Sequence, residues 1–289
     1  MNNKSEFFPV GKVVAPLCTT MMVAGLLFPP GSANAQNITL SDGGSTATIN
    51  PGLINGGSGT LGMDNWSVLG GQNQLNQQWF WYSVNGSTAA SIDTIGGYNS
   101  TLNAPNDVTL TYQNAQLQVN IEYVLSGNGV SSGSADLMEY ISIVNSGNSQ
   151  LSLNFYQYSN FNLLQNNQNM VSISGSPGGY TGATQTTGGP GGSGLAEVIN
   201  APDANYAEAG LASPTLGDVE SGILNGNLLA GPGDVSWAFE WNATLQGGQE
   251  LDITKDKGLS IQIVPEPSTF AMIVVGVAAL GLARRRQSS

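Results

Sequence analysis

The chain has 289 residues and a formal net charge of −12, with 19 acidic residues against 7 basic ones, one cysteine and no histidine. The missing histidine excludes Ser-His-Asp and Cys-His catalysis and histidine-ligated metals, and the negative charge argues against a nucleic-acid partner. Charged residues are 9% of the chain, well below the roughly 25% of an average globular protein, so neutral polar side chains must cover most of the surface.

Residues 1–35 are predicted to be a signal peptide for Sec-type export. Two lysines give it a positive start, residues 13–28 are mostly apolar, and Ala33-Asn34-Ala35 is a small-x-small cleavage site. We expect cleavage between Ala35 and Gln36, and the alternative is an uncleaved membrane anchor. The single cysteine lies in this leader, so the mature chain can form no intramolecular disulfide.

Residues 36–264 are predicted to form one all-β domain, an antiparallel, jelly-roll-like β-sandwich. Apolar and polar side chains alternate along it, as in strands with one buried face. Strands are expected at residues 38–40, 46–50, 79–84, 108–112, 117–125, 137–144, 151–158, 170–174, 235–244 and 259–264. The turn signal at 145–148 predicts a hairpin that joins the strands before and after it.

Three other segments of the domain carry weaker patterns. Residues 175–194 are rich in Gly, Thr and Pro and are expected to form a long surface loop, or else a boundary between two subdomains. Residues 197–211 are a candidate short helix. Residues 255–258, which hold the only two basic side chains of the mature domain, are expected to form a turn.

Five aromatic residues are candidate glycan contacts, because aromatic rings pack on the apolar faces of sugars while Asn and Gln bond the hydroxyl groups. They are Trp79, Trp81, Tyr82, Tyr156 and Tyr158. For any one of them, packing in the core is the favoured alternative.

Carboxylates are the remaining candidates for chemistry. Asp218 and Glu220 are the nearest approach to a calcium-binding pair, with solvated turn residues as the alternative, and no other cofactor is expected. Glu122, Glu139 and Glu240 lie on expected strands and could serve a glycoside hydrolase. Strand alternation, however, turns Glu122 and Glu240 outward as solvated acids, so we predict that the protein is not an enzyme.

The end of the chain has three parts in order. Pro265-Glu266-Pro267 cannot continue a helix, residues 269–283 are an apolar span expected to enter the membrane, and Arg284-Arg285-Arg286 stop transfer on the cytoplasmic side. The span is short for a stable anchor, since about 20 apolar residues cross a bilayer. We therefore expect a membrane-inserted precursor that is processed at the Pro-Glu-Pro motif.

Residues 265–289 resemble the PEP-CTERM sorting signal, which the membrane protease/transpeptidase exosortase recognises. The resemblance implies an exosortase-type processing partner, transient membrane insertion, and delivery to the cell surface, outer envelope or extracellular matrix. It also implies a link to exopolysaccharide and biofilm, because these systems accompany exopolysaccharide production. A non-catalytic surface or matrix protein is therefore predicted, with a carbohydrate-binding module and a carboxylate-dependent glycoside hydrolase as alternatives.

Overall fold

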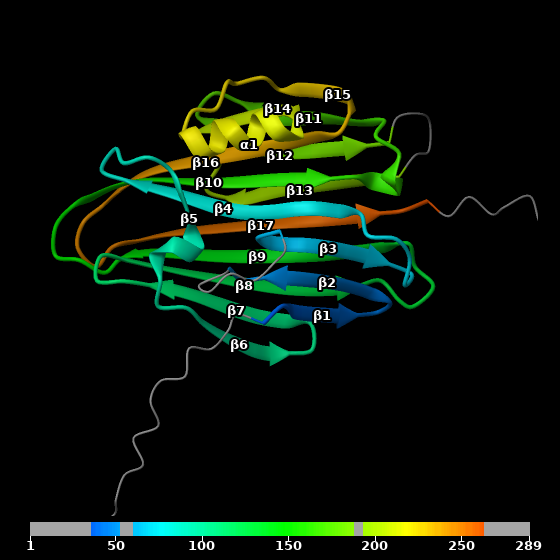
Figure 1. Ribbon diagram of the computed structural model, residues 1–289, viewed down its shortest axis with the longest axis horizontal. Helices are drawn as coiled ribbons and strands as arrows, with labels where there is room; N and C mark the ends of the chain where they lie inside the picture. The colour runs from blue at the N-terminus through cyan, green and yellow to red at the C-terminus, as the bar shows by residue number, and fades with distance from the viewer. Residues whose placement is uncertain (1–35, 53–59, 188–192, 263–289) are drawn as a thin grey trace, which may run out of the picture. The chain divides into compact units, whose positions relative to one another are not determined.

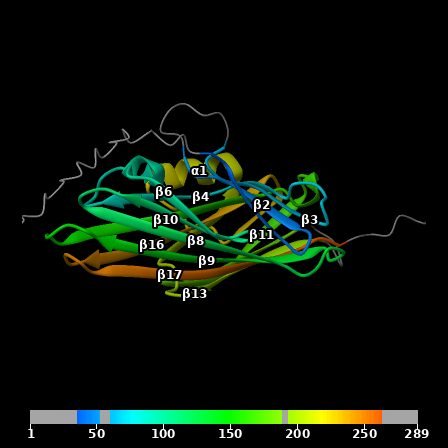
Figure 2. The ribbon, with the colours of Figure 1, turned by 90° about the horizontal axis from the view of Figure 1, so that it is seen from below.

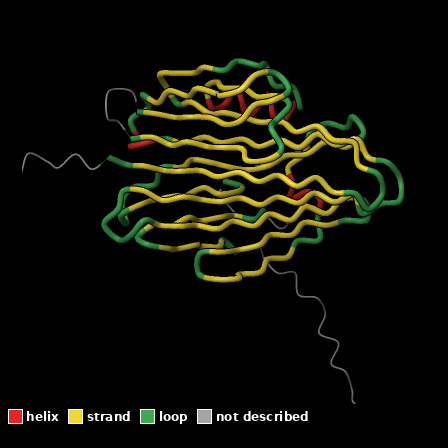
Figure 3. The backbone as a smooth tube through the Cα atoms, turned by 180° about the vertical axis from the view of Figure 1, so that it is seen from behind, coloured by secondary structure: helices red, strands yellow, loops and turns green. Residues whose placement is uncertain are grey.

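Two antiparallel β-sheets and one α-helix make up the part of the chain that the structure describes, residues 36–52, 60–187 and 193–262 of a computed structural model (Figure 1). Seen along the sheets, α1 lies against one sheet, on the side away from the other (Figure 2). From behind, long strands run side by side across the molecule and loops join them at their ends (Figure 3).

The first sheet, sheet A, has the strand order β1-β2-β3-β4-β10-β16-β14, with β5 added beside β4. Its strands are β1 (Ile38–Asp42), β2 (Ser45–Asn50), β3 (Gly62–Val68), β4 (Leu75–Val84), β5 (Ala90–Ser91), β10 (Leu151–Phe161), β14 (Tyr206–Leu211) and β16 (Val235–Leu245). The helix α1 (Ala212–Ser221) follows β14 and ends at Gly222, whose left-handed backbone lets its N–H bond the carbonyls of Asp218 and Val219.

The second sheet, sheet B, has the strand order β15-β11-β12-β13-β17-β9-β8-β7-β6. Its strands are β6 (Asn99–Ala104), β7 (Asp107–Gln113), β8 (Leu117–Gly127), β9 (Ser134–Asn145), β11 (Asn169–Ser176), β12 (Gly179–Thr186), β13 (Gly194–Ala201), β15 (Leu229–Gly233) and β17 (Glu250–Ser260). Two short 3-10 helices, η1 (Ile92–Ile95) and η2 (Leu163–Gln165), lie in connections.

The core lies between the facing sides of the two sheets and is rich in aromatic rings. Phe161 stacks on Trp237 with ring centroids 5.6 Å apart, and Phe80 stacks on Phe155 at 5.4 Å. Alternation along β8 buries every second residue from Leu117 to Leu125. The all-β antiparallel prediction is confirmed, although the seventeen strands of the described residues, eight in one sheet and nine in the other, exceed the eight strands that a jelly roll has in total.

The predicted hairpin at residues 145–148 is wrong, because β9 and β10 belong to different sheets. β9 pairs with β8 and β17, whereas β10 pairs with β4 and β16. Asn145 stabilises the connection from sheet B to sheet A. Its side-chain amide donates to the carbonyls of Ser149 and Leu245 at 2.8 and 2.9 Å. The turn residues reverse the chain here without pairing the strands on either side.

Three further expectations are corrected. The predicted loop at 175–194 contains β12, which pairs with β11 and β13, while residues 188–192 lie outside the described part. The candidate helix at 197–211 is instead the end of β13 and all of β14, because Leu195, Glu197 and Ile199 point inward at strand spacing. The expected turn at 255–258 lies inside β17.

Both sorting segments lie outside the described residues, including the signal peptide, the Pro-Glu-Pro motif, the apolar span and the three arginines. Among the helices of residues 36–52, 60–187 and 193–262, none is long and apolar enough to span a membrane.

Candidate functional site

A groove of about 400 Å³ runs across the outer face of sheet B. Strand β9 forms its centre, where Tyr140 lies between Glu122 of β8 and Thr254 of β17. In the next row, Ser142 lies between Asn120 of β8 and Asp252 of β17. Hydroxyl, amide and carboxylate groups from three neighbouring strands therefore face one open groove.

Tyr140 is the exposed aromatic ring of this groove, with 42% of its surface accessible. Glu122 and Asp252 stand on either side of β9, so their strands are about 10 Å apart. The outward direction predicted for Glu122 is confirmed, since it lines the groove opposite the buried face of β8. Such a surface offers one ring face and a set of hydrogen-bonding groups to a ligand.

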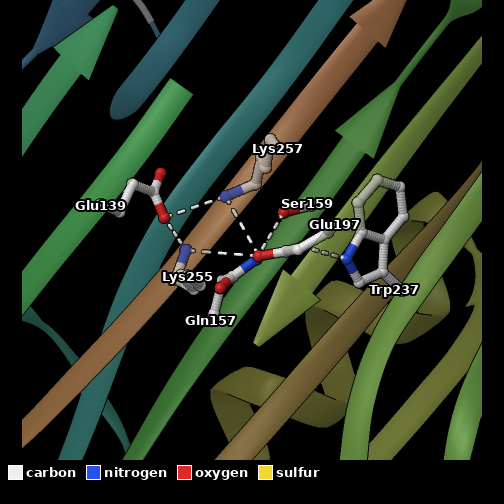
Figure 4. A network of polar contacts seen from close by, with 7 residues as sticks. All are labelled: Glu139, Gln157, Ser159, Glu197, Trp237, Lys255 and Lys257. Atoms are coloured by element: carbon white, nitrogen blue, oxygen red, sulfur yellow. Dashed lines mark hydrogen bonds and ion pairs between the residues drawn. The ribbon is translucent and has the colours of Figure 1, made fainter. Parts of the chain in front are cut away.

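A second polar cluster lies in the centre of the core and holds both basic residues of the domain (Figure 4). Lys255 and Lys257 of β17 point inward between Glu139 of β9 and Glu197 of β13. Lys257 Nζ lies 2.9 Å from Glu139 Oε2 and 3.1 Å from Glu197 Oε1, and Lys255 contacts the same two carboxylates. All four side chains come from sheet B.

Sheet A completes the cluster from the opposite side. Gln157 Nε2 donates to both oxygens of Glu197, at 2.7 and 2.9 Å, and Trp237 Nε1 donates to Glu197 Oε2 at 2.6 Å. Burial, and to a smaller extent the neighbouring ammonium group of Lys257, lowers the pKa of Lys255. The side chains of this cluster are at most 2% exposed, so it joins the two sheets and offers no surface to a ligand.

Four of the five candidate glycan-contact rings are buried. Trp79, Trp81, Tyr156 and Tyr158 are at most 5% exposed, and Tyr82 is partly buried. Trp81 packs edge-to-face on Tyr158 with ring centroids 6.3 Å apart. As they are placed here, these rings therefore form no open platform.

The third candidate carboxylate, Glu240, projects from sheet A on the face away from Trp237, as strand alternation predicts. It is nevertheless only 6% exposed, which corrects the expectation of a solvated acid. Burial raises the pKa of Glu240 to about 7, against the opposing effect of the Asn242 side chain. A carboxyl with a pKa near neutrality can exchange protons at physiological pH.

Glu208 of β14 lies diagonally across from Glu240, since its register partner on β16 is Ala238. Its two oxygens accept hydrogen bonds from Thr215 Oγ1 at 3.1 Å and from the Asn225 N–H at 2.8 Å. Burial also raises the pKa of Glu208. Glu208 was not singled out from the sequence, and its place in a segment expected to be helical hid its outward direction.

The two weak calcium candidates lie on α1, where Glu220 is exposed and Asp218 Oδ2 accepts a hydrogen bond from Asn225 at 3.2 Å. Within the described ranges, no group of three or more Asp, Glu, Cys or His side chains is placed to hold a metal ion. Tyr140 and Asp252 of the groove were missed as well, although strand alternation alone turns Tyr140 outward.

Comparisons with solved structures identify similar folds in carbohydrate-active proteins. A bacterial glucoamylase complexed with acarbose is 12% identical with a TM-score of 0.54, covering 84% of this chain and 35% of that chain. A galactose mutarotase-like protein from Lactobacillus casei ATCC 334 is 12% identical (TM-score 0.46, 78% of this chain, 100% of that chain). A GH36 alpha-galactosidase from Geobacillus stearothermophilus is 7% identical (TM-score 0.43, 78% and 40%).

Of these three, the glucoamylase has a TM-score above 0.5, and at 12% identity it shows the fold alone. The prediction that the protein is not an enzyme is contradicted, because this fold occurs within a carbohydrate-active enzyme. Missing histidine excludes several mechanisms, but glycoside hydrolysis needs only two carboxyl groups. No curated protein matches the sequence.

The end of the chain gives the clearest sequence match. Residues 264–287 match the family model of the PEP-CTERM protein-sorting motif, which confirms the resemblance seen in the sequence. The chain therefore carries a PEP-CTERM sorting motif and is an exported protein sorted through its C-terminal segment by an exosortase-type system.

Proposed function

We propose that the exported domain binds a neutral polysaccharide in the groove on the outer face of sheet B. The observation that carries the proposal is the groove itself, in which exposed Tyr140 is surrounded by hydroxyl, amide and carboxylate groups of β8, β9 and β17. Sugars are recognised in this way, with a ring against their apolar face and polar groups around their hydroxyls.

The charge of the surface favours a neutral ligand. Lys255 and Lys257 are the only basic residues between residues 36 and 262, and both are fully buried. The described surface therefore presents carboxylates and neutral polar groups, which repel an anionic polymer at long range. A neutral chain meets no such repulsion.

Two further observations support a carbohydrate ligand. The fold is shared with part of a glucoamylase that was crystallised with acarbose. The sorting motif also marks the protein for the cell envelope, where we propose that it reaches the surface or the extracellular matrix and associates with exopolysaccharide and biofilm. The membrane-anchored precursor and Sec-type export belong to the same proposal.

A second candidate function, acid–base chemistry on a sugar, is favoured by Glu240. Its pKa of about 7 suits a group that gives or takes a proton, and Glu208 is a second carboxyl one strand away. In hydrolysis, water would supply the hydroxyl and the proton that the two sugar fragments gain. Under this candidate, Glu240→Gln abolishes release of reducing ends from neutral oligosaccharides, while Glu220→Gln on the surface of α1 leaves it unchanged.

Affinity electrophoresis of the full-length chain through gels that contain neutral or anionic polysaccharide tests the main proposal. We expect retardation by a neutral glucan that Tyr140→Ala weakens about tenfold, about 1.4 kcal/mol. Tyr140→Phe should keep most of the binding, because it keeps the ring. Val198→Ala, an exposed change on β13 outside the groove, is the matched control. Equal retardation of wild type and Tyr140→Ala would contradict the proposal.

A further inference from the structure

The outer face of sheet A carries a row of large side chains across four adjacent strands. Trp81 of β4 is paired with Tyr156 of β10, Tyr156 with Glu240 of β16, and Glu240 with Tyr206 of β14. Tyr158 lies on the same face of β10, edge-to-face with Trp81. Aromatic rings and hydroxyl groups are thus concentrated on one side of one sheet, beside an acid.

Helix α1 covers this face (Figure 2), with Val219 and Leu216 packed against the hydrophobic core and with polar contacts to the tyrosines. The hydroxyl of Tyr158 donates to the carbonyl of Ala212 at 3.0 Å, and that of Tyr156 donates to the carbonyl of Gly222 at 3.4 Å. The helix itself buries two side chains, Thr215 and Val219. The tyrosine hydroxyls therefore bond the backbone at both ends of the helix, where a ligand hydroxyl could replace those carbonyls.

Helix α1 is held by the packing of Val219 and Leu216 and by single hydrogen bonds, whereas continuous ladders of backbone hydrogen bonds hold the strands beneath it. A helix of 10 residues is marginal by itself in water, and hydrogen bonds at a partly solvated surface contribute little net stability. In contrast, β16 pairs with β10 along nearly its whole length and with β14 over residues 235–240, and it buries seven consecutive residues. Local opening of α1 should consequently occur far more often than opening of the sheet.

We propose that α1 is a strap over a second carbohydrate site, in which a neutral sugar packs on Trp81, Tyr156 and Tyr158 once the strap opens. This inference rests on the proposed carbohydrate function and deepens it by adding a covered site on the opposite sheet. A neutral ligand is specified because Glu208 and Glu240 flank the face and both lysines lie in the core. The Asn154 amide donates to the Tyr156 hydroxyl at 3.2 Å. Aromatic rings with hydroxyl and amide groups beside them are the groups that bind sugars.

The chain offers a direct way to lock the strap. A Cβ added at Gly222 would lie 3.8 Å from the Cβ of Ala89, which is the mean separation across a disulfide. It would also lie 3.2 Å from the hydroxyl oxygen of Tyr156, a close contact that the single-cysteine variant shares. Cys18, the single native cysteine, belongs to the predicted leader. The double variant Gly222→Cys with Ala89→Cys should form this disulfide, and Gly222→Cys alone controls for the left-handed backbone at that position, where φ is 75°.

Binding is measured in full-length protein that also carries Tyr140→Ala, so that the groove of sheet B no longer contributes. The probes are maltoheptaose and cellohexaose. We expect residual binding by the reduced double variant, at least a tenfold loss on oxidation, and recovery on reduction. Equal binding by the oxidised and reduced forms would overturn the proposal that α1 must open to admit the sugar.

The remaining outcomes separate this inference from the proposed function. If the wild type binds these probes but the Tyr140→Ala protein does not, the covered site is overturned and the groove is upheld. If the wild type binds neither probe, both are overturned.

Hydrogen exchange of the unmodified full-length chain tests the opening without any engineered cysteine. We expect the amides of α1 to exchange at least 100-fold faster than those at the centre of β16, through local opening. Exchange of α1 and β16 at the same rate would mean that α1 opens only with the whole domain, and would overturn the strap.

Discussion

Lys255 and Glu139 are register partners on β17 and β9, and their side chains form an ion pair that is fully buried between the two sheets. Lys257 and Glu197 complete a set of two ammonium and two carboxylate groups with no net charge. Because each charge is removed from water, the set is stable only as long as both signs are present.

Removal of one member of this set should therefore destabilise the domain strongly. Lys255→Met leaves one buried carboxylate in excess and should lower the free energy of unfolding by about 3–5 kcal/mol. The double variant Lys255→Met with Glu139→Leu should recover most of that loss. Denaturant unfolding measures both, with the exposed change Glu250→Gln as control. A single variant as stable as wild type would show that the cluster carries no stability.

Glu240 should make stability depend on pH. Its pKa is raised to about 7 in the folded state from the ordinary value of 4.5 for a glutamate, so the folded state binds the proton more tightly. This contribution is fully present below about pH 4.5 and is lost as pH rises through 7. Since the carboxyl keeps some contact with solvent, screening reduces the effect to about 1–2 kcal/mol.

Comparing the pH dependence of stability in variants isolates the contribution of the Glu240 carboxyl. Urea unfolding at pH 5 and at pH 8 should show a smaller loss of stability for Glu240→Gln than for wild type, because Gln does not titrate. Val198→Ala, which removes no titratable group, should behave like wild type between these two pH values. An unchanged pH dependence in Glu240→Gln would contradict the raised pKa.

Two glycines with positive φ allow the cost of backbone strain to be measured apart from the cost of a steric clash. An added Cβ at Gly62, where φ is 88°, would collide with the carbonyl oxygen of Gln78 and the ring of Trp79, whereas at Gly86, where φ is 75°, it would meet open space. Gly86→Ala should cost about 1 kcal/mol through backbone strain alone. Gly62→Ala should cost about 3 kcal/mol or more, as measured by thermal or denaturant unfolding. Equal costs would place β3 and β4 further apart than described.

Sorting should depend on the Pro-Glu-Pro motif. We expect the triple change Pro265→Ala, Glu266→Ala and Pro267→Ala to leave the precursor in the membrane fraction with its C-terminal mass uncut. Ser260→Ala, at the end of β17, should leave sorting unchanged. If the triple variant has the same C-terminal mass and the same location as wild type, the motif does not direct processing.

The strands were the most predictable part of this fold, because alternation at period two is a local signal. The sheet assignment of β9 and β10 was not predictable, since the turn residues between them allow either a hairpin or a crossing. The two lysines show a similar limit: Ile253, Lys255, Lys257 and Leu259 are evenly spaced as one strand face, but the partners of the lysines, Glu139 and Glu197, lie on other strands. A buried charge can be recognised only once its partner is in place.

For the candidate site residues, too, the local pattern predicted the direction of a side chain but not its burial. Alternation turned Glu122 outward correctly and gave Glu240 the right face, but the burial of Glu240 depends on what packs over that face, which alternation does not reveal. The aromatic candidates were chosen by residue type, and four of the five are buried. Tyr140 could have been found from strand position alone, because it falls on the outward face of a clearly alternating strand.

Co-sedimentation of the full-length protein with exopolysaccharide from its own producing cells tests the central claim most directly. It is measured between about 0.05 and 0.5 M NaCl, a range over which exposed charges become screened. We predict that wild type is retained equally at all salt concentrations, as expected for a neutral ligand, and that Tyr140→Ala binds about tenfold more weakly. Failure of wild type to sediment with the polysaccharide, or equal retention of Tyr140→Ala, would contradict carbohydrate recognition by the groove of sheet B.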